Sequence, residues 1–192
     1  MKNKLILASS SPRRVDLLAM AGITPDEIIP ADIDETSLPR EKPEHLCVRL
    51  ARGKAEKIAQ DNPGAIVLGA DTVVACGRRD LGKPVDEADA RHMLELLSGR
   101  RHKVYGGLCV ISAEGKVFTR LCTTTVAFRR LSKADIDAYS ESREWDGKAG
   151  GYAVQGLAAR FVKFISGSHS NIVGLSVYDA AAMLDSAGYK KD

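Results

Sequence analysis

The stretch Lys4-Leu5-Ile6-Leu7-Ala8-Ser9-Ser10-Ser11-Pro12-Arg13-Arg14 decides the fold of this chain, because an apolar run passes directly into the start of a helix. Residues 4–8 predict a short buried strand. Ser11 is the expected N-cap of a helix over about 12–21, with proline at the first helical position and Gly22 at the end. A strand followed at once by a helix is typical of an α/β protein.

The rest of the chain continues this alternation of strands and helices. Ala113-Glu114-Gly115 is a turn between two long apolar strands, which predicts an antiparallel hairpin. Together with the strand–helix units, the hairpin predicts one α/β domain over residues 1–192, with a mixed β-sheet flanked by helices. The other expected elements are strands over 28–30, 65–76, 103–112, 116–129 and 158–165, helices over 43–60, 86–99, 132–142 and 176–188, and loops over 147–156 and 166–174. Capping boxes are expected at the starts of the last two helices, formed by Ser132 with Asp135 and by Ser176 with Asp179.

Composition and charge exclude several classes of protein. The 192 residues carry a net charge of +3, which is too small to indicate a nucleic-acid-binding protein. No stretch approaches the ~20 apolar residues of a membrane-spanning helix, and the N-terminal apolar run is too short for a secretion signal. The four cysteines are scattered without the spacing of zinc ligands. We therefore expect a cytoplasmic protein whose partners are neither a membrane nor a nucleic acid.

The hydroxyl and guanidinium groups at the start of the first helix predict an anion site. A helix N-terminus presents free N–H groups and a partial positive charge. Ser9-Ser10-Ser11 and Arg13-Arg14 add further donors at this position, an arrangement that suits phosphate oxygens. The alternative is one capping serine followed by solvated arginines, which accounts for fewer of these residues.

Asp71 and Lys54 are the next candidates, because both interrupt apolar patterns. Asp71 lies inside the apolar strand 65–75, where an ionised carboxylate is costly unless a cation or hydrogen bonds compensate it. Lys54 lies on the apolar side of its helix, between Ala51 and Ile58. The alternatives are a strand end at which the aspartate meets solvent, and a lysine whose alkyl stem covers apolar surface while its ammonium reaches water.

Three further segments carry weaker signals. The acidic run Asp32, Asp34 and Glu35 offers hard oxygen ligands for Mg²⁺, although a solvated acidic loop fits the spacing equally well. Gly82-Lys83-Pro84 holds a lysine between two residues that constrain the backbone. The glycines of 147–156 indicate close backbone approach, with a flexible hairpin loop as the alternative. Neither a Walker loop nor a GxGxxG motif occurs, which removes support for the usual kinase and dinucleotide-binding classes. The residues alone predict a phosphate-handling α/β enzyme with a metal site.

The chain also resembles the Maf proteins, in several separate blocks that follow the same order. These blocks span nearly the whole chain, which makes the resemblance highly specific. Ser176-Val177 departs from the family, many of whose members have a proline there, and we expect this change to affect the last helix rather than the chemistry. The blocks are 7–14, Ala51-Arg52-Gly53-Lys54-Ala55, Gly69-Ala70-Asp71-Thr72-Val73-Val74, Gly82-Lys83-Pro84, Lys148-Ala149-Gly150-Gly151-Tyr152-Ala153-Val154-Gln155-Gly156 and Gly167-Ser168-His169-Ser170-Asn171-Ile172-Val173-Gly174-Leu175.

The resemblance implies a fold shared with inosine-triphosphate pyrophosphatases, an elongated mixed sheet flanked by helices with a cleft between two lobes. It also implies hydrolysis of nucleoside triphosphates to the monophosphate and pyrophosphate, dependent on Mg²⁺ or Mn²⁺. Tyr152-Ala153-Val154-Gln155 resembles the branch that acts on dTTP, UTP and modified pyrimidine nucleotides. Because family members are linked to septum formation, a nucleotide-binding regulator of cell division is one alternative, and a nonspecific phosphatase is another.

Roles for individual residues follow from the resemblance and from charge. The family assigns the aspartate that matches Asp71 as proton acceptor, and whether this residue is a base, a metal ligand or both stays open. The sequence also leaves open the physiological substrate, the metal and the oligomeric state, for which a homodimer is one possibility. The expected roles are catalysis for Asp71, Lys54, Lys83 and Arg13, substrate binding and choice for Ser9, Ser10, Arg13, Arg14, Thr72 and Gln155, and metal binding for Glu35 and Asp71.

Overall fold

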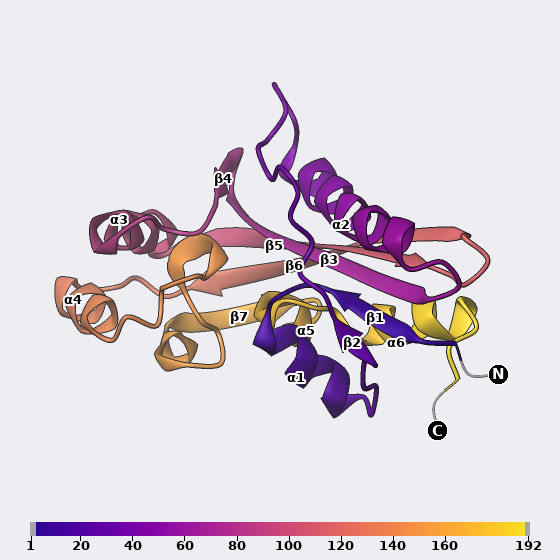
Figure 1. Cartoon of the computed structure of the whole chain (residues 1–192). Coiled ribbons are helices and arrows are strands. Elements are labelled where there is room, and N and C mark those ends of the chain that lie inside the picture. Colours follow the sequence, from indigo (N-terminus) through magenta and orange to yellow (C-terminus); the bar gives the residue numbers. More distant parts are fainter. Residues whose placement is uncertain (1–2, 191–192) are drawn as a thin grey trace.

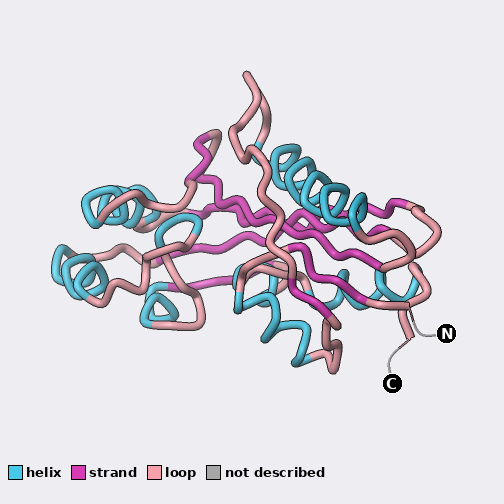
Figure 2. Tube along the Cα trace, in the orientation of Figure 1, coloured by secondary structure: helices cyan, strands magenta, loops and turns pink. Residues whose placement is uncertain are grey.

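The computed structural model describes residues 3–190 and shows a mixed β-sheet with helices on both faces (Figure 1). Figure 2 separates the elements by type. The strands are β1 (Leu5–Ala8), β2 (Glu27–Ile28), β3 (Ile66–Cys76), β4 (Arg79–Leu81), β5 (Arg101–Ile111), β6 (Val117–Phe128) and β7 (Val162–Ser166). The helices are α1 (Pro12–Met20), α2 (Pro43–Asp61), α3 (Glu87–Leu97), α4 (Lys133–Glu141), α5 (His169–Val173) and α6 (Val177–Ser186), with 3₁₀ segments η1 (Ala149–Gly151) and η2 (Leu157–Phe161).

The sheet combines parallel and antiparallel strands in the order β2-β1-β3-β5-β6-β7, and β4 pairs with β3 outside this path. β1 runs parallel to both of its neighbours, β2 and β3. From β3 onwards the strands β5, β6 and β7 are antiparallel to the strand before them. The mixed sheet and the long hairpin expected from the sequence are therefore confirmed.

The alternation of side chains along β1 explains why helices cover both faces of the sheet. Consecutive residues of a strand point to opposite faces. Leu5 and Leu7 pack in the core that contains residues of α1 and α6, whereas Ile6 and Ala8 pack in the core that contains residues of α2. The short apolar run at the start of the chain is therefore buried on both sides.

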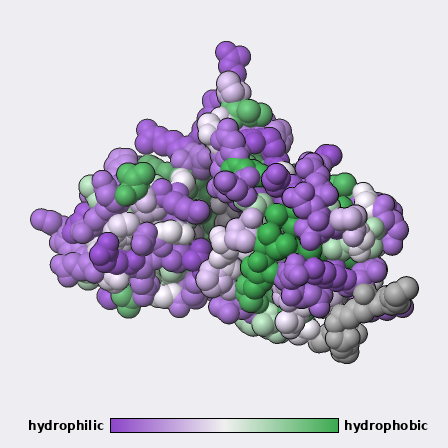
Figure 3. Space-filling model, viewed as in Figure 1, coloured by the Kyte–Doolittle hydropathy of each residue, from purple (hydrophilic) through white to green (hydrophobic). Residues whose placement is uncertain are grey.

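The strands β5 and β6 carry the sheet to a second end, where α3, α4 and η2 pack (Figure 1). A separate apolar core fills this end and includes Leu94 of α3, Tyr139 of α4 and Phe161 of η2. The expected two lobes are thus present, with separate cores on a shared sheet. Figure 3 shows a mostly hydrophilic surface with a recess between the two ends.

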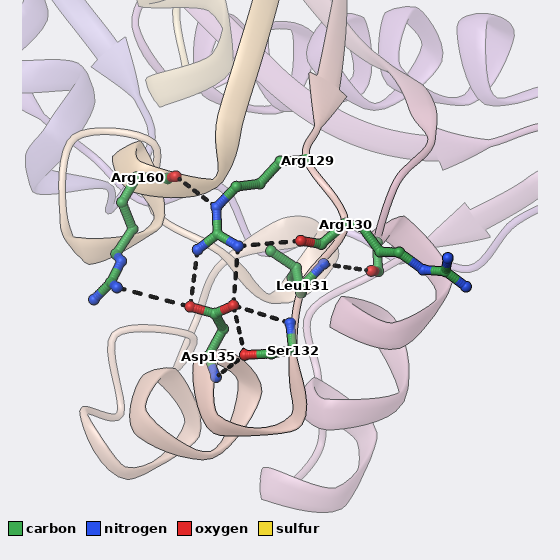
Figure 4. A network of polar contacts seen from close by, with 7 residues as sticks. Arg129, Arg130, Leu131, Ser132, Asp135 and Arg160 are labelled. Carbon is green, nitrogen blue, oxygen red and sulfur yellow. Dashed lines mark hydrogen bonds and ion pairs between the residues drawn. The ribbon is translucent and has the colours of Figure 1, made fainter.

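An ion-pair network fixes the start of α4 against the end of β6 (Figure 4). Arg129, which directly follows β6, donates to both oxygens of the Asp135 carboxylate over 2.8 and 2.9 Å. Asp135 also accepts hydrogen bonds from the backbone N–H and the hydroxyl of Ser132, which completes the expected capping box. The hydrogen bonds from Arg129 and Ser132 hold the pKa of Asp135 well below its ordinary value. The orientation of α4 is therefore set at its first turn.

Several elements differ from the expectation. The strand expected over 28–30 is β2 at Glu27–Ile28, and the loop expected over 147–156 contains η1. The strand predicted over 158–165 begins only at Val162, because η2 precedes it and buries Ala158 and Phe161, which are three residues apart as the 3₁₀ period requires. The loop predicted over 166–174 contains α5, whose N-cap Ser168 accepts the N–H of Asn171. The short strand β4 was not expected. None of the helices within residues 3–190 is both long and apolar enough to span a membrane.

His102 is a buried histidine in the core beside α3 and α4. It is 2% exposed and lies edge-on against the rings of Phe128 and Tyr152, with its Nε2 atom 2.8 Å from the Tyr152 hydroxyl. Burial lowers the pKa of His102 from 6.5 to about 4. Between these two pH values, His102 binds a proton in the unfolded chain but not in the folded chain. The free energy of unfolding therefore decreases as the pH falls from 6.5 towards 4.

We expect acidification from pH 7 to 4.5 to cost the wild type about 2–3 kcal/mol more stability than a His102→Gln variant. Glutamine keeps a hydrogen-bond partner for Tyr152 but cannot titrate. Urea unfolding at both pH values measures the free energy of unfolding, and the carboxylates contribute alike to the two proteins. Equal acid sensitivity of wild type and variant would contradict a neutral buried histidine.

Candidate functional site

The site opens where one edge of β3 lacks a strand neighbour. β1 pairs with β3 only as far as Gly69, and β4 joins the same edge from Val74. Within the described part of the chain, residues 70–73 have no strand partner on this side, while β5 holds their other edge in the sheet. A crevice beyond the carboxyl end of a parallel strand is the usual place for a ligand in an open α/β sheet.

A cavity of about 480 Å³ occupies this gap, a volume typical of small-molecule sites. Segments far apart in the sequence form its wall, from the end of β1 to the C-terminal end of α5. Of the acidic run, Asp32 and Asp34 do not line it, and the Asp34 carboxylate instead accepts the N–H of Thr36. Every predicted site residue does line the cavity, namely Ser9, Ser10, Arg13, Arg14, Glu35, Lys54, Asp71, Thr72, Lys83 and Gln155.

Lys54 and Asp71 form a buried ion pair in the cleft. The Lys54 Nζ atom lies 2.7 Å from Asp71 Oδ1, and the two side chains are 10% and 11% exposed. The same ammonium lies 2.6 Å from Oε1 of Glu35, whose side chain is half-exposed. Burial would raise the pKa of Glu35, but the hydrogen bond from Lys54 and the charges of Lys54 and Lys83 bring it below its ordinary value. The ammonium group of Lys54 therefore forms ion pairs with two carboxylates.

Two glycines allow α2 to approach the sheet closely enough for this ion pair. A Cβ atom on Gly69 of β3 would overlap the carbonyl oxygen of Ala51, and one on Gly107 of β5 would overlap that of Cys47. The backbone of α2 therefore rests directly on the strands, and the lysine of the ion pair, one turn beyond Ala51, reaches the aspartate. A larger residue at either position would push the helix away.

Arg14 is buried, and its guanidinium joins three separate segments. It donates to Ser9 Oγ over 2.8 Å, to the Gly174 carbonyl oxygen over 3.0 Å and to Thr72 Oγ1 over 3.4 Å. The Thr72 hydroxyl in turn donates to the same Gly174 oxygen over 3.3 Å. Burial lowers the pKa of Arg14, against the opposing charge of Asp71. This arginine thus braces the start of α1, strand β3 and the end of α5.

The N-terminus of α1 faces the cleft with hydroxyl and guanidinium groups. Ser11 is at the N-cap as expected, but its side chain makes no capping bond, because the Arg14 N–H donates to the Ser11 carbonyl oxygen instead. Arg13 is half-buried, and its Nη2 atom lies 3.4 Å from the Gly147 carbonyl oxygen. Burial lowers the pKa of Arg13. The positive helix end and this guanidinium together suit an anion.

Two charged residues in the cleft were missed by the sequence-based prediction. Asp80 lies on β4, where burial and the charge of Asp71 raise its pKa. Lys148 donates to the Asp146 carbonyl oxygen over 2.9 Å, and burial and the charge of Arg13 lower its pKa. Lys148 begins one of the sequence blocks shared with the Maf proteins, and this position could have identified it as a site residue. Asp80 gave none, because β4 itself was not expected.

Two carboxylates of the cleft are the metal ligands expected from the sequence. Within residues 3–190, no group of three or more His, Cys, Asp or Glu side chains is placed to hold a metal ion. The two expected ligands, Glu35 and Asp71, nevertheless converge on one ammonium group. Two hard oxygen donors fit Mg²⁺ or Mn²⁺ when the remaining ligands come from phosphate oxygens or water.

Comparison with known proteins gives consistent results. Residues 4–187 match the family described as Maf-like protein. A dTTP/UTP pyrophosphatase of Paramagnetospirillum magneticum is 58% identical over 185 residues, covering 96% of this chain and 97% of that protein. One from Sphingopyxis alaskensis is 55% identical over 184 residues, covering 96% of each chain. The structure of a HAM1 protein from Coxiella burnetii shares the fold, with TM-score 0.51, 18% identity and coverage of 96% and 99%. This chain therefore belongs to the Maf family.

Proposed function

We propose that this chain hydrolyses nucleoside triphosphates, dTTP and UTP first, to the monophosphate and pyrophosphate with the help of a divalent cation. The observation that carries the proposal is the buried ion pair of Asp71 and Lys54, which lies in a cleft rich in groups that bind phosphate. The names of the similar proteins from Paramagnetospirillum magneticum and Sphingopyxis alaskensis support the substrate class.

Glu35 and Asp71 are the residues that we propose to hold Mg²⁺ or Mn²⁺, together with phosphate oxygens of the substrate. The fit rests on two hard oxygen donors that already share one cationic partner. Such a cation supplies positive charge that offsets the phosphates.

The fixed charges of the protein supply the rest of the phosphate binding. A triphosphate brings about four negative charges, which must be offset before water can attack. Arg13, Lys54 and Lys83 line the cleft, and the N-terminus of α1 adds its partial positive charge. We propose that Arg14 acts mainly as a brace, because its donors already engage three protein oxygens.

Asp71 is proposed to accept the proton of the attacking water. The water oxygen forms a bond to the α-phosphorus, and the bond from that phosphorus to the α–β bridging oxygen breaks. Pyrophosphate leaves with the bridging oxygen, and the proton taken by Asp71 later returns to solvent. Because Lys54 holds Asp71 in the free enzyme, its ammonium must turn towards the phosphates before Asp71 can act.

A product assay in isotopically labelled water tests the reaction directly. The purified protein is given UTP, dTTP or GTP in H₂¹⁸O, with Mg²⁺ or with a chelator, and the products are separated by anion exchange. We expect monophosphate and pyrophosphate in equal amounts, with the label in the monophosphate, because water attacks the α-phosphorus. Nucleoside diphosphate and orthophosphate as products would overturn the proposal.

Gln155 is proposed to select the base. Its amide offers a donor and an acceptor, which match the adjacent N–H and C=O groups of uracil and thymine. It is exposed to the cleft that Thr72 and Arg13 also line. We expect wild type to favour UTP over GTP, and Gln155→Ala to reduce that ratio of kcat/KM by about tenfold or more, since sites that hydrogen-bond a substrate discriminate strongly. A ratio that the substitution leaves untouched would remove Gln155 from base selection.

Arg13→Ala is expected to lower kcat/KM for UTP by about tenfold or more, because a charged hydrogen bond contributes about 1.5–3 kcal/mol. Arg52→Ala is the matched control, since Arg52 pairs with Glu56 on the exposed side of α2 and does not line the cleft. Steady-state kinetics and circular dichroism are measured for both variants. Equal kinetics of the two would move Arg13 out of the phosphate site.

A further inference from the structure

The glycine-rich segment 147–156 is held by the core and is not a flexible hairpin loop. Gly150 and Gly151 have φ values of 72° and 68°, which favour glycine, and both are buried. The Gly150 N–H donates to the Gly82 carbonyl oxygen over 3.0 Å. A Cβ atom on Gly150 would lie 2.8 Å from Cγ1 of Val74 on β3. The segment is therefore pressed against the sheet just before it reaches Gln155.

Two buried side chains hold the residues that lie two and three positions before Gln155. The N–H of Ala153 donates to the Tyr139 hydroxyl over 2.9 Å, and the hydroxyl of Tyr152 lies 2.8 Å from Nε2 of His102. Tyr139 is 1% exposed and His102 is 2% exposed. Neither side chain lines the cleft. Both side chains therefore contact the segment on the side away from the cleft and do not reach a ligand in the cleft.

The elements that carry these two anchors are themselves fixed. Tyr139 is on α4, whose first turn is tied to the end of β6 by Arg129 and Asp135 (Figure 4). His102 is on β5, whose backbone pairs with both β3 and β6. Burial also raises the pKa of Tyr139 to about 12 and lowers that of His102 to about 4, so both anchors stay neutral between these limits.

We propose that Tyr139 and His102 are positioning residues that set the base preference, by fixing the backbone from which Gln155 reaches the cleft. The inference rests on the proposed role of Gln155. A buried N–H without a partner is costly, so the Ala153 N–H either keeps the Tyr139 hydroxyl or moves to find water. A shift of about 1 Å at a recognition group costs up to about 10²-fold in rate. Pyrimidine recognition is therefore sensitive to residues that never touch the base.

Tyr139→Phe tests the inference, because it removes the hydroxyl and keeps the ring. We expect the UTP/GTP ratio of kcat/KM to fall about tenfold, through a loss on UTP with little change on GTP. In a Gln155→Ala background the same substitution is expected to add nothing, because the two residues act through one contact. Tyr152→Phe, which removes the hydroxyl beside His102, is the second variant and is expected to act in the same direction.

Ile136→Val is the matched control, because Ile136 is buried on the same helix as Tyr139 and its side chain cannot form hydrogen bonds. It softens the core while leaving the anchors intact, so its ratio is expected to stay within about twofold of wild type. All variants are assayed at a temperature at which circular dichroism shows each of them folded.

The outcomes separate this inference from the proposed function. If Gln155→Ala lowers the ratio and both tyrosine variants leave it unchanged, the positioning role is overturned and base selection by Gln155 stands. If Gln155→Ala leaves the ratio unchanged, base selection fails and the positioning role fails with it. If Ile136→Val lowers the ratio as much as Tyr139→Phe, the effect is a general loss of rigidity and the inference is overturned.

Discussion

Asp71→Asn is expected to lower kcat by about 10²–10⁴-fold, the loss that follows removal of a general base. The amide keeps the size of the carboxylate but cannot accept the proton of the attacking water. Its ion pair with Lys54 is lost as well. Because Glu35 stays within 2.6 Å of the same ammonium, the lysine is not left buried without a partner. The fold should therefore survive, and a thermal unfolding curve shows whether it does.

Asp80→Asn is the comparison variant for Asp71→Asn. Both carboxylates belong to the same cleft, but Asp80 lies on β4 and has no ion pair with Lys54. Single-turnover hydrolysis of UTP with both variants is expected to show a loss below about tenfold for Asp80→Asn, far from the loss caused by removing a base. Turnover of Asp71→Asn within a few-fold of wild type would contradict the proposed role of Asp71 as general base.

Local signals in the sequence were sufficient for most of the fold. Apolar runs located β1 and β3, and the turn at 113–115 located the β5–β6 hairpin. The pairs Ser132 with Asp135 and Ser176 with Asp179 marked the starts of α4 and α6. These signals succeed because caps and turns are decided by residues only a few positions apart. The 3₁₀ segment η2 was missed because its apolar residues also fit a short strand.

The candidate residues were also predictable, but their arrangement was not. A carboxylate in an apolar strand and a lysine on an apolar helix face each indicate an unusual environment from the amino-acid pattern alone. The contact between this carboxylate and this lysine depends on Gly69 and Gly107, which let α2 rest directly on β3 and β5. The two glycines are 38 residues apart in the sequence. Strand pairing over such distances leaves no local signal. The unpaired edge at 70–73 also depends on strand pairing. It arises because β1 pairs with the N-terminal part of β3, whereas β4 pairs with its C-terminal part.

Lys54 has two carboxylate partners in the free enzyme, and this sharing has consequences for the proposed metal site. The charges of Glu35 and Asp71 are partly neutralised by one ammonium, with Arg14 adding positive charge nearby. We therefore expect a free divalent cation to gain little by binding between these carboxylates, because it must compete with the lysine. We expect a cation that is bound to a triphosphate to bind the carboxylates more readily, because the phosphate oxygens give Lys54 new partners.

Lys54→Met is expected to change hydrolysis and metal binding in opposite directions. Loss of the proposed charged contact to phosphate is expected to lower kcat/KM for UTP by about 10- to 100-fold. Loss of the ammonium leaves Glu35 and Asp71 without their shared partner, so Mn²⁺ should bind more tightly when no nucleotide is present. The Glu35 carboxyl also loses the contact that lowers its pKa, which moves the acid limb of the pH–rate profile to higher pH.

Lys83→Met separates these effects from a simple change of charge in the cleft. It removes the same charge from the same cavity, but Lys83 forms no ion pair with either carboxylate. Calorimetric titration with Mn²⁺ is expected to show tighter binding for Lys54→Met than for Lys83→Met, while both variants hydrolyse UTP more slowly. Equal Mn²⁺ affinity in the two variants would mean that Lys54 does not compete with the metal.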